Sequence, residues 1–168
     1  YGGILSLLAA GLLLVPFSRV RLKRGLAWGL GAAGLAGAAG VFLVRGNEGL
    51  APLRLRLENW QQAWKVCARH PFFGTGFGNL GDTMTAFQHP QMNETVYAHN
   101  SYLQVAAEGG MVAAVLMAAA LGVLIAGMGR GLQKDPDALD RLVGCLSVTA
   151  FLIHNLFDFS AYLPSLLL

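Results

Sequence analysis

The residues best suited to catalysis or ligand binding lie between positions 54 and 99. Among them are His99 and three arginines, Arg54, Arg56 and Arg69. The imidazole of His99 can take or hold a proton near neutral pH. Arg54, Arg56 and Arg69 have no matching acidic cluster, and such arginines favour a phosphorylated or carboxylated ligand. Two interpretations of His99 stay open: a role in chemistry, or a structural hydrogen bond at the start of a helix.

A helix over residues 53–67 is expected to carry these arginines. One face gathers the apolar side chains of Leu53, Leu57, Trp60, Trp64 and Cys67. The opposite face carries Arg54, Glu58, Gln61 and Lys65. We predict an amphipathic helix at a membrane interface, with its tryptophans at headgroup level. At about 100° per residue, Arg56 falls at the edge of the apolar stripe. Its charge must therefore reach the surface or meet an anion.

A glycine-rich stretch follows this helix and precedes His99. Pro71 ends the helix, and the glycines from Gly74 to Gly81 permit backbone turns that other residues avoid. Residues 82–98 show no clear period and are predicted to be a loop. The helical pattern resumes at His99 and is expected to run straight into a membrane span, holding His99 about 15 Å above Gly109. The face of His99 and Leu103 should pack inward, with Ser101, Gln104 and Glu108 on the opposite face.

The composition is that of a membrane protein: 55% of the 168 residues are hydrophobic and only 12% are charged. We predict an all-α, polytopic helical bundle that forms one truncated membrane domain, inactive without further helices. Uncharged runs place its spans at about 2–17, 25–44, 109–129 and 142–157, with another beginning near 162. Basic residues in the short loops at 19–24 and 130–141 predict that those loops are cytoplasmic. The long loop at 45–108 would then face the other side.

Several other site types are disfavoured. The net charge of +3 comes from short basic clusters beside apolar runs, so nucleic acid is not an expected partner. The spacings between His70, His89 and His99 match no known metal-binding pattern. Cys67 and Cys145 lie far apart in the sequence and do not supply the paired cysteine ligands of a zinc site. The G-x-G-x-x-G pattern at 76–81 lacks a preceding strand and a following helix, which favours a structural turn over dinucleotide binding. Amides flanking Gly76 and Gly78 remain candidates for lining an anion pocket. For Asp158, a helix cap is favoured over orientation of a nearby Arg or His.

Three sequence blocks follow one another in a recognisable order: Arg56-Leu57-Glu58-Asn59-Trp60, the stretch from His70 to Asn79, and His99-Asn100-Ser101-Tyr102-Leu103-Gln104 with Glu108-Gly109-Gly110. Together they resemble the O-antigen ligase and polymerase superfamily. The closing His154-Asn155-Leu156-Phe157-Asp158-Phe159 is similar to the C-terminal half of that family. Of the ligase pattern that begins at the histidine, His99, Asn100 and Gly110 match, whereas Ala113 stands where Gly, Thr or Tyr is expected. This departure leaves polymerase and protein-glycosylating relatives open.

The resemblance implies a GT-C-like glycosyltransferase of the bacterial inner membrane that needs no metal or cofactor. Such enzymes take a glycan from an undecaprenyl-diphosphate carrier at the periplasmic face and pass it to a hydroxyl of an acceptor glycan or of lipid A core. Arg56, and next Arg69, would stabilise charge on the leaving diphosphate, and His99 would orient or deprotonate the acceptor hydroxyl. Arg54, Asn100, Gly76 and Gly78 complete the expected substrate-binding set.

Two other functions are compatible with the pattern. A flippase would bind the same lipid-linked diphosphate without chemistry, but it should carry ionisable residues within its spans, and His154 is the only one. A noncatalytic scaffold for polysaccharide export would tolerate the loss of His99 and Arg56. The enzyme is therefore favoured.

Overall fold

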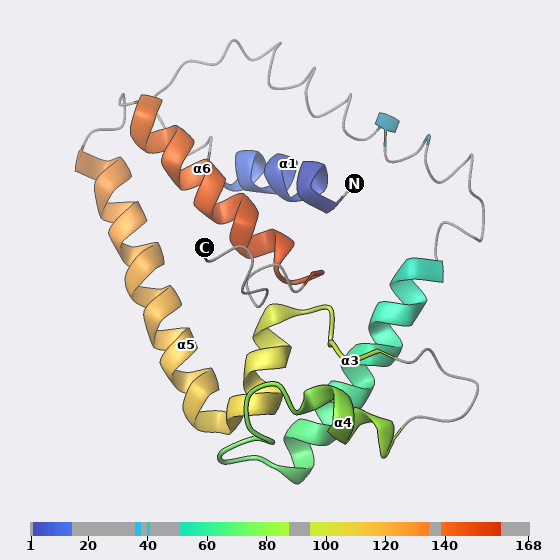
Figure 1. Cartoon of the computed structure of the whole chain (residues 1–168). Coiled ribbons are helices and arrows are strands. Elements are labelled where there is room, and N and C mark those ends of the chain that lie inside the picture. The colour runs from blue at the N-terminus through green and yellow to red at the C-terminus, as the bar shows by residue number, and fades with distance from the viewer. Residues whose placement is uncertain are drawn as a thin grey trace. The chain divides into compact units, whose positions relative to one another are not determined.

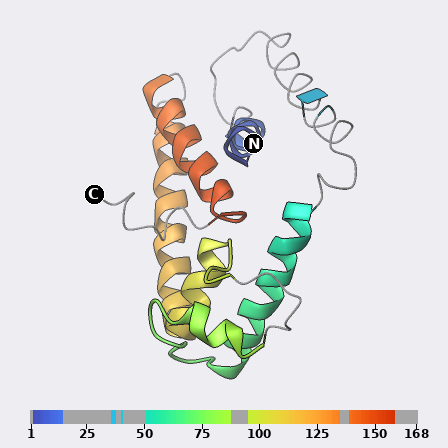
Figure 2. The same cartoon turned by 45° about the vertical axis from the view of Figure 1, so that its right-hand side comes forward.

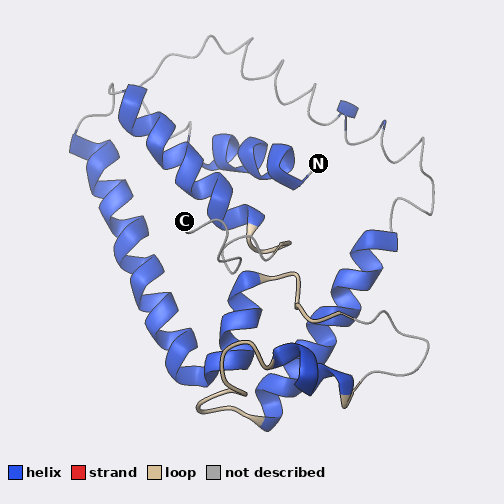
Figure 3. Cartoon of the chain, viewed as in Figure 1, coloured by secondary structure: helices blue, strands red, loops and turns tan. Residues whose placement is uncertain are grey.

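The computed structural model describes residues 2–14, 36–37, 40, 51–87, 95–134 and 139–158. These residues form helices and loops and contain no strand (Figure 3). The helices are α1 (Gly2–Leu14), α3 (Ala51–Arg69), α4 (Leu80–Thr85), α5 (Ser101–Lys134) and α6 (Leu139–His154). The expected all-helical class is confirmed for this part of the chain. The predicted span at 25–44, the basic loop at 19–24 and the span beginning near 162 lie outside the described residues, apart from three positions.

The chain divides into two compact units, residues 1–51 with 123–154 and residues 52–122 with 155–168. In the first unit, α1 packs against α6. The buried residues of α1 are the small Ser6 and Ala10, one turn apart, whereas Leu12 and Leu13 are exposed. Small residues at the contact and large apolar residues outside are typical of helices that pack within lipid.

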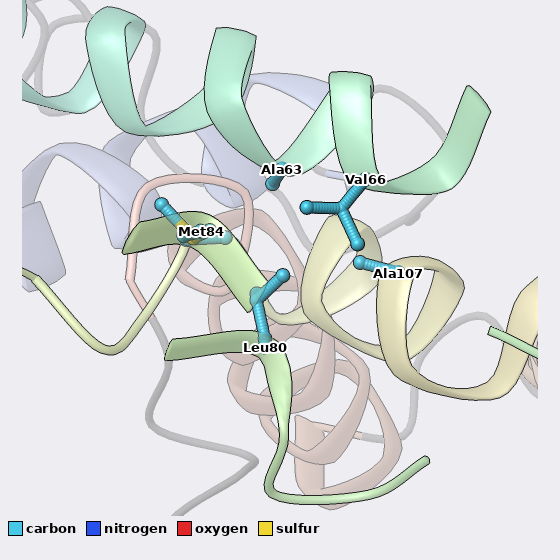
Figure 4. Packing of buried hydrophobic residues seen from close by; sticks show 6 residues of the cluster. Ala63, Val66, Leu80, Met84 and Ala107 are labelled. Carbon is cyan, nitrogen blue, oxygen red and sulfur yellow. The ribbon is translucent and has the colours of Figure 1, made fainter. Parts of the chain in front are cut away.

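The second unit has a small core where α3, α4 and the start of α5 meet (Figure 4). Its fully buried side chains are those of Ala63, Val66, Leu80, Met84, Ala98 and Ala107. The short helix α4 contributes Leu80 and Met84, which are four residues apart and so share one face. The predicted loop over 82–98 is therefore wrong at its start. A helix of six residues is too short for its period to be visible in the sequence.

The sequence predicted that the helix after His99 runs straight into a span, but helix α5 is broken at Gly110. Gly110 has φ 67° and ψ −164°, which breaks the helix into an arm of residues 101–109 and an arm of residues 111–134. Two views show the first arm folding back from the break in a V (Figures 1 and 2). His99 therefore does not stand above the span on an extension of its axis. Gly110 lets the chain reverse because glycine tolerates a backbone conformation that side chains exclude.

The first arm of α5 also buries the face that was expected to point away from the core. Ser101, Gln104 and Glu108 are almost fully buried, whereas Leu103 is only half-buried. The buried polar groups satisfy one another: the Gln104 Nε2 donates to Glu108 Oε1 at 2.8 Å, and the Ala98 amide donates to Gln104 Oε1 at 2.8 Å. Hydrogen bonding of this kind offsets the cost of removing polar side chains from water.

The second arm of α5 belongs to the one described helix that is long and apolar enough to cross a membrane. Its apolar run from Met111 to Gly129 measures about 28 Å at 1.5 Å per residue, close to the hydrocarbon thickness of a bilayer. Arg130 follows this run directly.

Candidate functional site

The backbone at His99 adopts an unusual conformation. Its φ of 52° is the only positive φ found among the described non-glycine residues. Left-handed backbone costs a residue with a side chain roughly 1–2 kcal/mol, and such strain clusters at functional sites. The indole Nε1 of Trp60 in α3 donates to the His99 carbonyl at 3.3 Å. Trp60 thereby ties α3 to the residue that precedes the start of α5.

Asn100 forms the N-cap of α5. Its Oδ1 accepts a hydrogen bond from the Leu103 amide at 3.0 Å, and its carbonyl accepts the Gln104 amide at 2.9 Å. A side-chain oxygen in this position satisfies one of the amides that a helix start leaves without an intrahelical partner. The structure thus gives Asn100, which was predicted to bind substrate, a clear role in starting the helix that follows His99.

Ser101 fastens the start of α5 to residues 155–158, which follow α6 in the sequence. The Ser101 amide lies 3.0 Å from the carbonyl oxygens of both Asn155 and Asp158. Its hydroxyl lies 2.7 Å from Asn155 Oδ1 and 3.2 Å from the Asp158 carbonyl. The rings of Trp60 and Phe157 pack with their centroids 6.0 Å apart. Three segments distant in sequence therefore meet around His99.

The electrostatics of His99 report which charges surround it. Its pKa is lowered from the ordinary value of 6.5, first because burial disfavours the charged imidazolium and second because the Arg56 guanidinium repels it. The Asp158 carboxylate opposes both effects by raising the pKa. A histidine with a lowered pKa is neutral at pH 7 and can accept a proton. Arg56, His99 and Asp158 thus form a cluster with one base, one cation and one carboxylate.

Arg56 occupies a distinctive position on α3. The buried face of this helix consists of Asn59, Gln62, Ala63 and Val66. The predicted apolar stripe is largely exposed, with Leu53, Leu57 and Trp64 at 42%, 45% and 68%. At about 100° per residue, Arg56 lies between the buried face and this exposed apolar stripe. The Arg56 side chain is partly buried, and its position at this boundary suits a ligand that is itself partly apolar.

The other predicted arginines lie elsewhere on α3. Arg69 is thirteen residues from Arg56, about 20 Å along the helix axis. Its guanidinium lies over the ring of Phe87, 4.4 Å from the centroid. Arg54 is exposed and lies about 160° around the helix from Arg56. The structure therefore brings Arg56 and His99 together and leaves Arg69 and Arg54 apart from them.

The glycine-rich stretch meets α5 at its break. The amides of Thr75 and Gly76 donate to the carbonyls of Ala107 and Glu108, at 3.1 and 2.8 Å. In the other direction, the amides of Met111 and Val112 donate to the carbonyls of residues 71 and 72, at 2.7 and 3.3 Å. The loop thus caps both helix ends that the break creates, and these are backbone groups that need partners when buried.

Gly74 and Gly110 make this contact possible. A Cβ on Gly110 would overlap the carbonyl of Phe72 and the amide of Gly74, and a Cβ on Gly74 would overlap the backbone of Glu108 and Gly110. The amide of Gly76, a candidate for lining an anion pocket, donates instead to the Glu108 carbonyl and so joins the loop to α5. Of the G-x-G-x-x-G pattern, Gly76 takes part in this backbone junction, Gly78 has a positive φ of 82°, and Gly81 lies in α4 against Val96.

The comparison with protein families decides the relationship. A family model described as O-antigen ligase matches residues 2–118, more than half of the chain. The chain belongs to the O-antigen ligase family. No curated protein and no solved structure matches it significantly. The resemblance inferred from the sequence is confirmed, and the matched region includes Arg56, His99 and the Gly110 break.

Membership of the O-antigen ligase family makes this a membrane protein of glycosyltransferase type, related to polysaccharide biosynthesis, with lipid-linked glycan and acceptor as the general substrate classes. The family match ends at residue 118, before the block at residues 154–159 that also resembles the family. Asn155 and Asp158 therefore join the site on structural grounds. Asp158, for which a helix cap was the favoured prediction, accepts the Ser101 amide at the start of α5 through its backbone carbonyl, and its carboxylate raises the pKa of His99.

Trp60, Ser101 and Asn155 were not identified from sequence as parts of the site. Trp60 was assigned to the membrane-interface stripe, and its hydrogen bond to His99 depends on a tertiary contact that spacing does not reveal. Ser101 was placed on an outward face, although it bonds Asn155 and Asp158. Among the described residues, no group of three or more His, Cys, Asp or Glu side chains could hold a metal ion.

Proposed function

We propose that this chain transfers a glycan from a polyprenyl diphosphate carrier to an acceptor hydroxyl at the periplasmic face of the inner membrane. The observation that carries the proposal is the cluster of Arg56, a neutral His99 and Asp158, drawn together from three segments. Family membership supplies the reaction class, and the cluster supplies groups suited to each charge that the reaction develops.

In the proposed reaction, the acceptor hydroxyl attacks the anomeric carbon of the glycan. The bond from that carbon to the diphosphate oxygen breaks, and the electron pair leaves with the polyprenyl diphosphate. Arg56 stabilises the charge that develops on the leaving oxygen, since a guanidinium binds phosphate oxygens through a pair of parallel donors. His99 accepts the proton of the attacking hydroxyl, and Asp158 stabilises the resulting imidazolium.

The setting of Arg56 agrees with a donor that has an apolar tail. The exposed stripe of Leu53, Leu57 and Trp64 adjoins Arg56 on α3, so that a polyprenyl chain can remain in lipid while its diphosphate reaches the guanidinium. The chain reversal at Gly110 also turns the first arm of α5 away from the axis of the second arm (Figure 1). We therefore place Arg56 and His99 at the centre of the proposed site, and Asn100 as the residue that fixes the start of α5.

The test uses the full-length protein in cells that lack their own ligase or polymerase. Arg56→Ala and His99→Ala are expected to abolish transfer at unchanged protein level, as seen in gel profiles of surface glycans. Arg54→Ala is the matched control, because it removes an exposed arginine on another face of the same helix. Intact products from both Arg56→Ala and His99→Ala would refute the enzyme and favour a scaffold. The same gels distinguish transfer to lipid A core from chain lengthening.

Two further measurements bear on the setting of the reaction. Reporter fusions at Thr83 are expected to lie outside the cytoplasm, and a cytoplasmic result would overturn the proposed face. Transfer in washed membranes is expected to persist in the presence of a metal chelator. Loss of activity that is restored by a divalent cation would contradict the metal-independent mechanism.

A further inference from the structure

Three phenylalanines project from the loop that caps the break in α5. Phe72, Phe73 and Phe77 are 61%, 79% and 69% exposed. Single exposed apolar residues are common on proteins, but a group of large aromatic side chains within six residues marks an interaction surface. We define these three side chains as the phenylalanine patch.

The patch is held on a fixed backbone. The carbonyl of Phe72 accepts the Val112 amide at 3.3 Å, and the Gly76 amide donates to Glu108 at 2.8 Å, so the loop is bonded on both sides of the break. A Cβ placed on Gly109 would lie 3.5 Å from Cζ of Phe77, which locates this ring against the same turn. The exposed rings are therefore presented by a loop with defined contacts.

The patch continues an apolar surface of α5. Met111 and Val112 begin the second arm beside Phe72, and both are exposed, as are Val115 and Leu116 one turn further on. The run from Met111 to Gly129 is long enough to cross the hydrocarbon of a bilayer, and Arg130 follows it. If Arg130 marks one edge of the hydrocarbon, the length of the run places the break at the other edge.

We propose that the phenylalanine patch inserts into the outer lipid surface and anchors the break of α5 at headgroup level. Two observations favour lipid over a protein partner. The patch is continuous with the exposed face of the helix that can cross a membrane. The exposed Arg69 and His70 directly precede the loop, and an arginine beside aromatic side chains is typical of residues at a membrane–water interface.

The proposal rests on α5 crossing the membrane and not on the chemistry at His99. A failure here therefore leaves the proposed transfer reaction intact, and loss of transfer in the Arg56 and His99 variants leaves the anchor intact. The two ideas are tested by different measurements on the same full-length protein.

The experiment uses a cysteine-free version of the full-length protein in liposomes of phosphatidylethanolamine and phosphatidylglycerol. A nitroxide spin label is attached at Phe73→Cys, and its collisions with oxygen and with a water-soluble nickel chelate are measured. Val115→Cys is the lipid reference, and Asp82→Cys, an exposed polar position on α4, is the water reference. A second label at Phe77→Cys repeats the test if the first variant folds poorly.

The label at Phe73 is expected to favour oxygen over the nickel chelate, as at Val115 and unlike Asp82. Preference for the nickel chelate at both Phe73 and Phe77 would overturn the proposal by placing the patch in water. Low accessibility to both reagents would overturn it as well, because it would show the rings covered by protein.

Discussion

Replacing Gly110 by alanine tests whether the break in α5 is required to hold His99 in place. Gly110 combines φ 67° with ψ −164°, a region that is almost restricted to glycine. A side chain there costs about 1–3 kcal/mol in backbone strain alone. The added Cβ would also overlap the Phe72 carbonyl, so the hydrogen bonds that residues 71 and 72 accept from Met111 and Val112 would be lost or distorted.

Each of these two hydrogen bonds contributes roughly 1 kcal/mol. Together with the strain, Gly110→Ala should disfavour the described arrangement by about 4 kcal/mol, or nearly three orders of magnitude in the equilibrium constant. The expected results are a clear decrease in the thermal unfolding temperature of the purified full-length protein in detergent and a loss of transfer in cells. Transfer would be lost even if the protein remained folded with a straight α5. In a straight helix the first arm would point away from α3, and His99, which precedes this arm, would move away from Arg56.

Gly122→Ala is the matched control in the same helix. A Cβ at Gly122 meets nothing within 4 Å, so this substitution adds a methyl group without a clash. It should leave transfer unchanged and leave stability equal or slightly higher, since alanine favours helix by about 1 kcal/mol over glycine. Equal unfolding temperatures and equal transfer for Gly110→Ala and Gly122→Ala would refute the role assigned to the break.

Two further predictions concern the surroundings of His99. The Asp158 carboxylate raises the pKa of His99, so Asp158→Asn should lower that pKa further. Because the proposed transfer needs the neutral imidazole, the acid limb of the pH–activity profile should move to lower pH. A shift of this limb to higher pH would contradict the role assigned to Asp158. Trp60→Phe keeps an aromatic ring beside Phe157 but removes the hydrogen bond to the His99 carbonyl. Such a bond contributes roughly 1 kcal/mol, so the rate of transfer should decrease by up to about fivefold. The control Trp64→Phe changes an exposed tryptophan on the same helix and should leave transfer unchanged.

The parts of the fold that depend on local pattern could be predicted. The helix over 53–67 is present as α3 because its apolar and polar residues repeat at the helical period. The apolar run at 109–129 is present within α5. The break of α5 at Gly110 was missed, and so was the contact of the glycine-rich loop with that break. Gly110 lies within a stretch whose sequence pattern is otherwise helical throughout. Its conformation is set by the loop from Pro71 to Gly76, which is distant in sequence.

The inward face of the first α5 arm was missed for a related reason. Hydrophobic periodicity assumes that apolar residues face the core, as they do in soluble proteins. In this arm Ser101, Gln104 and Glu108 are buried together with Ala107. Gln104 and Glu108 bond each other one turn apart, whereas the Ser101 bond to Asn155 joins residues that are distant in sequence and that spacing alone does not locate. In a protein whose large apolar side chains face lipid, polar residues between helices are the ones that specify contacts.

The candidate site depends on both kinds of information. Residue chemistry identified Arg56 and His99, because an arginine at the edge of an apolar stripe and a histidine before a helix are visible in one sequence. Their proximity could not be predicted, since it requires the Trp60 bond to His99 and the Ser101 bonds to residues 155–158. The same geometry separates Arg69 from Arg56 by about 20 Å along α3, although the sequence made Arg69 the second candidate for the leaving diphosphate. The Arg69 guanidinium lies over the Phe87 ring instead, and no Arg69 charge contributes to the pKa shift of His99 as that of Arg56 does, so Arg69→Ala should weaken transfer far less than Arg56→Ala.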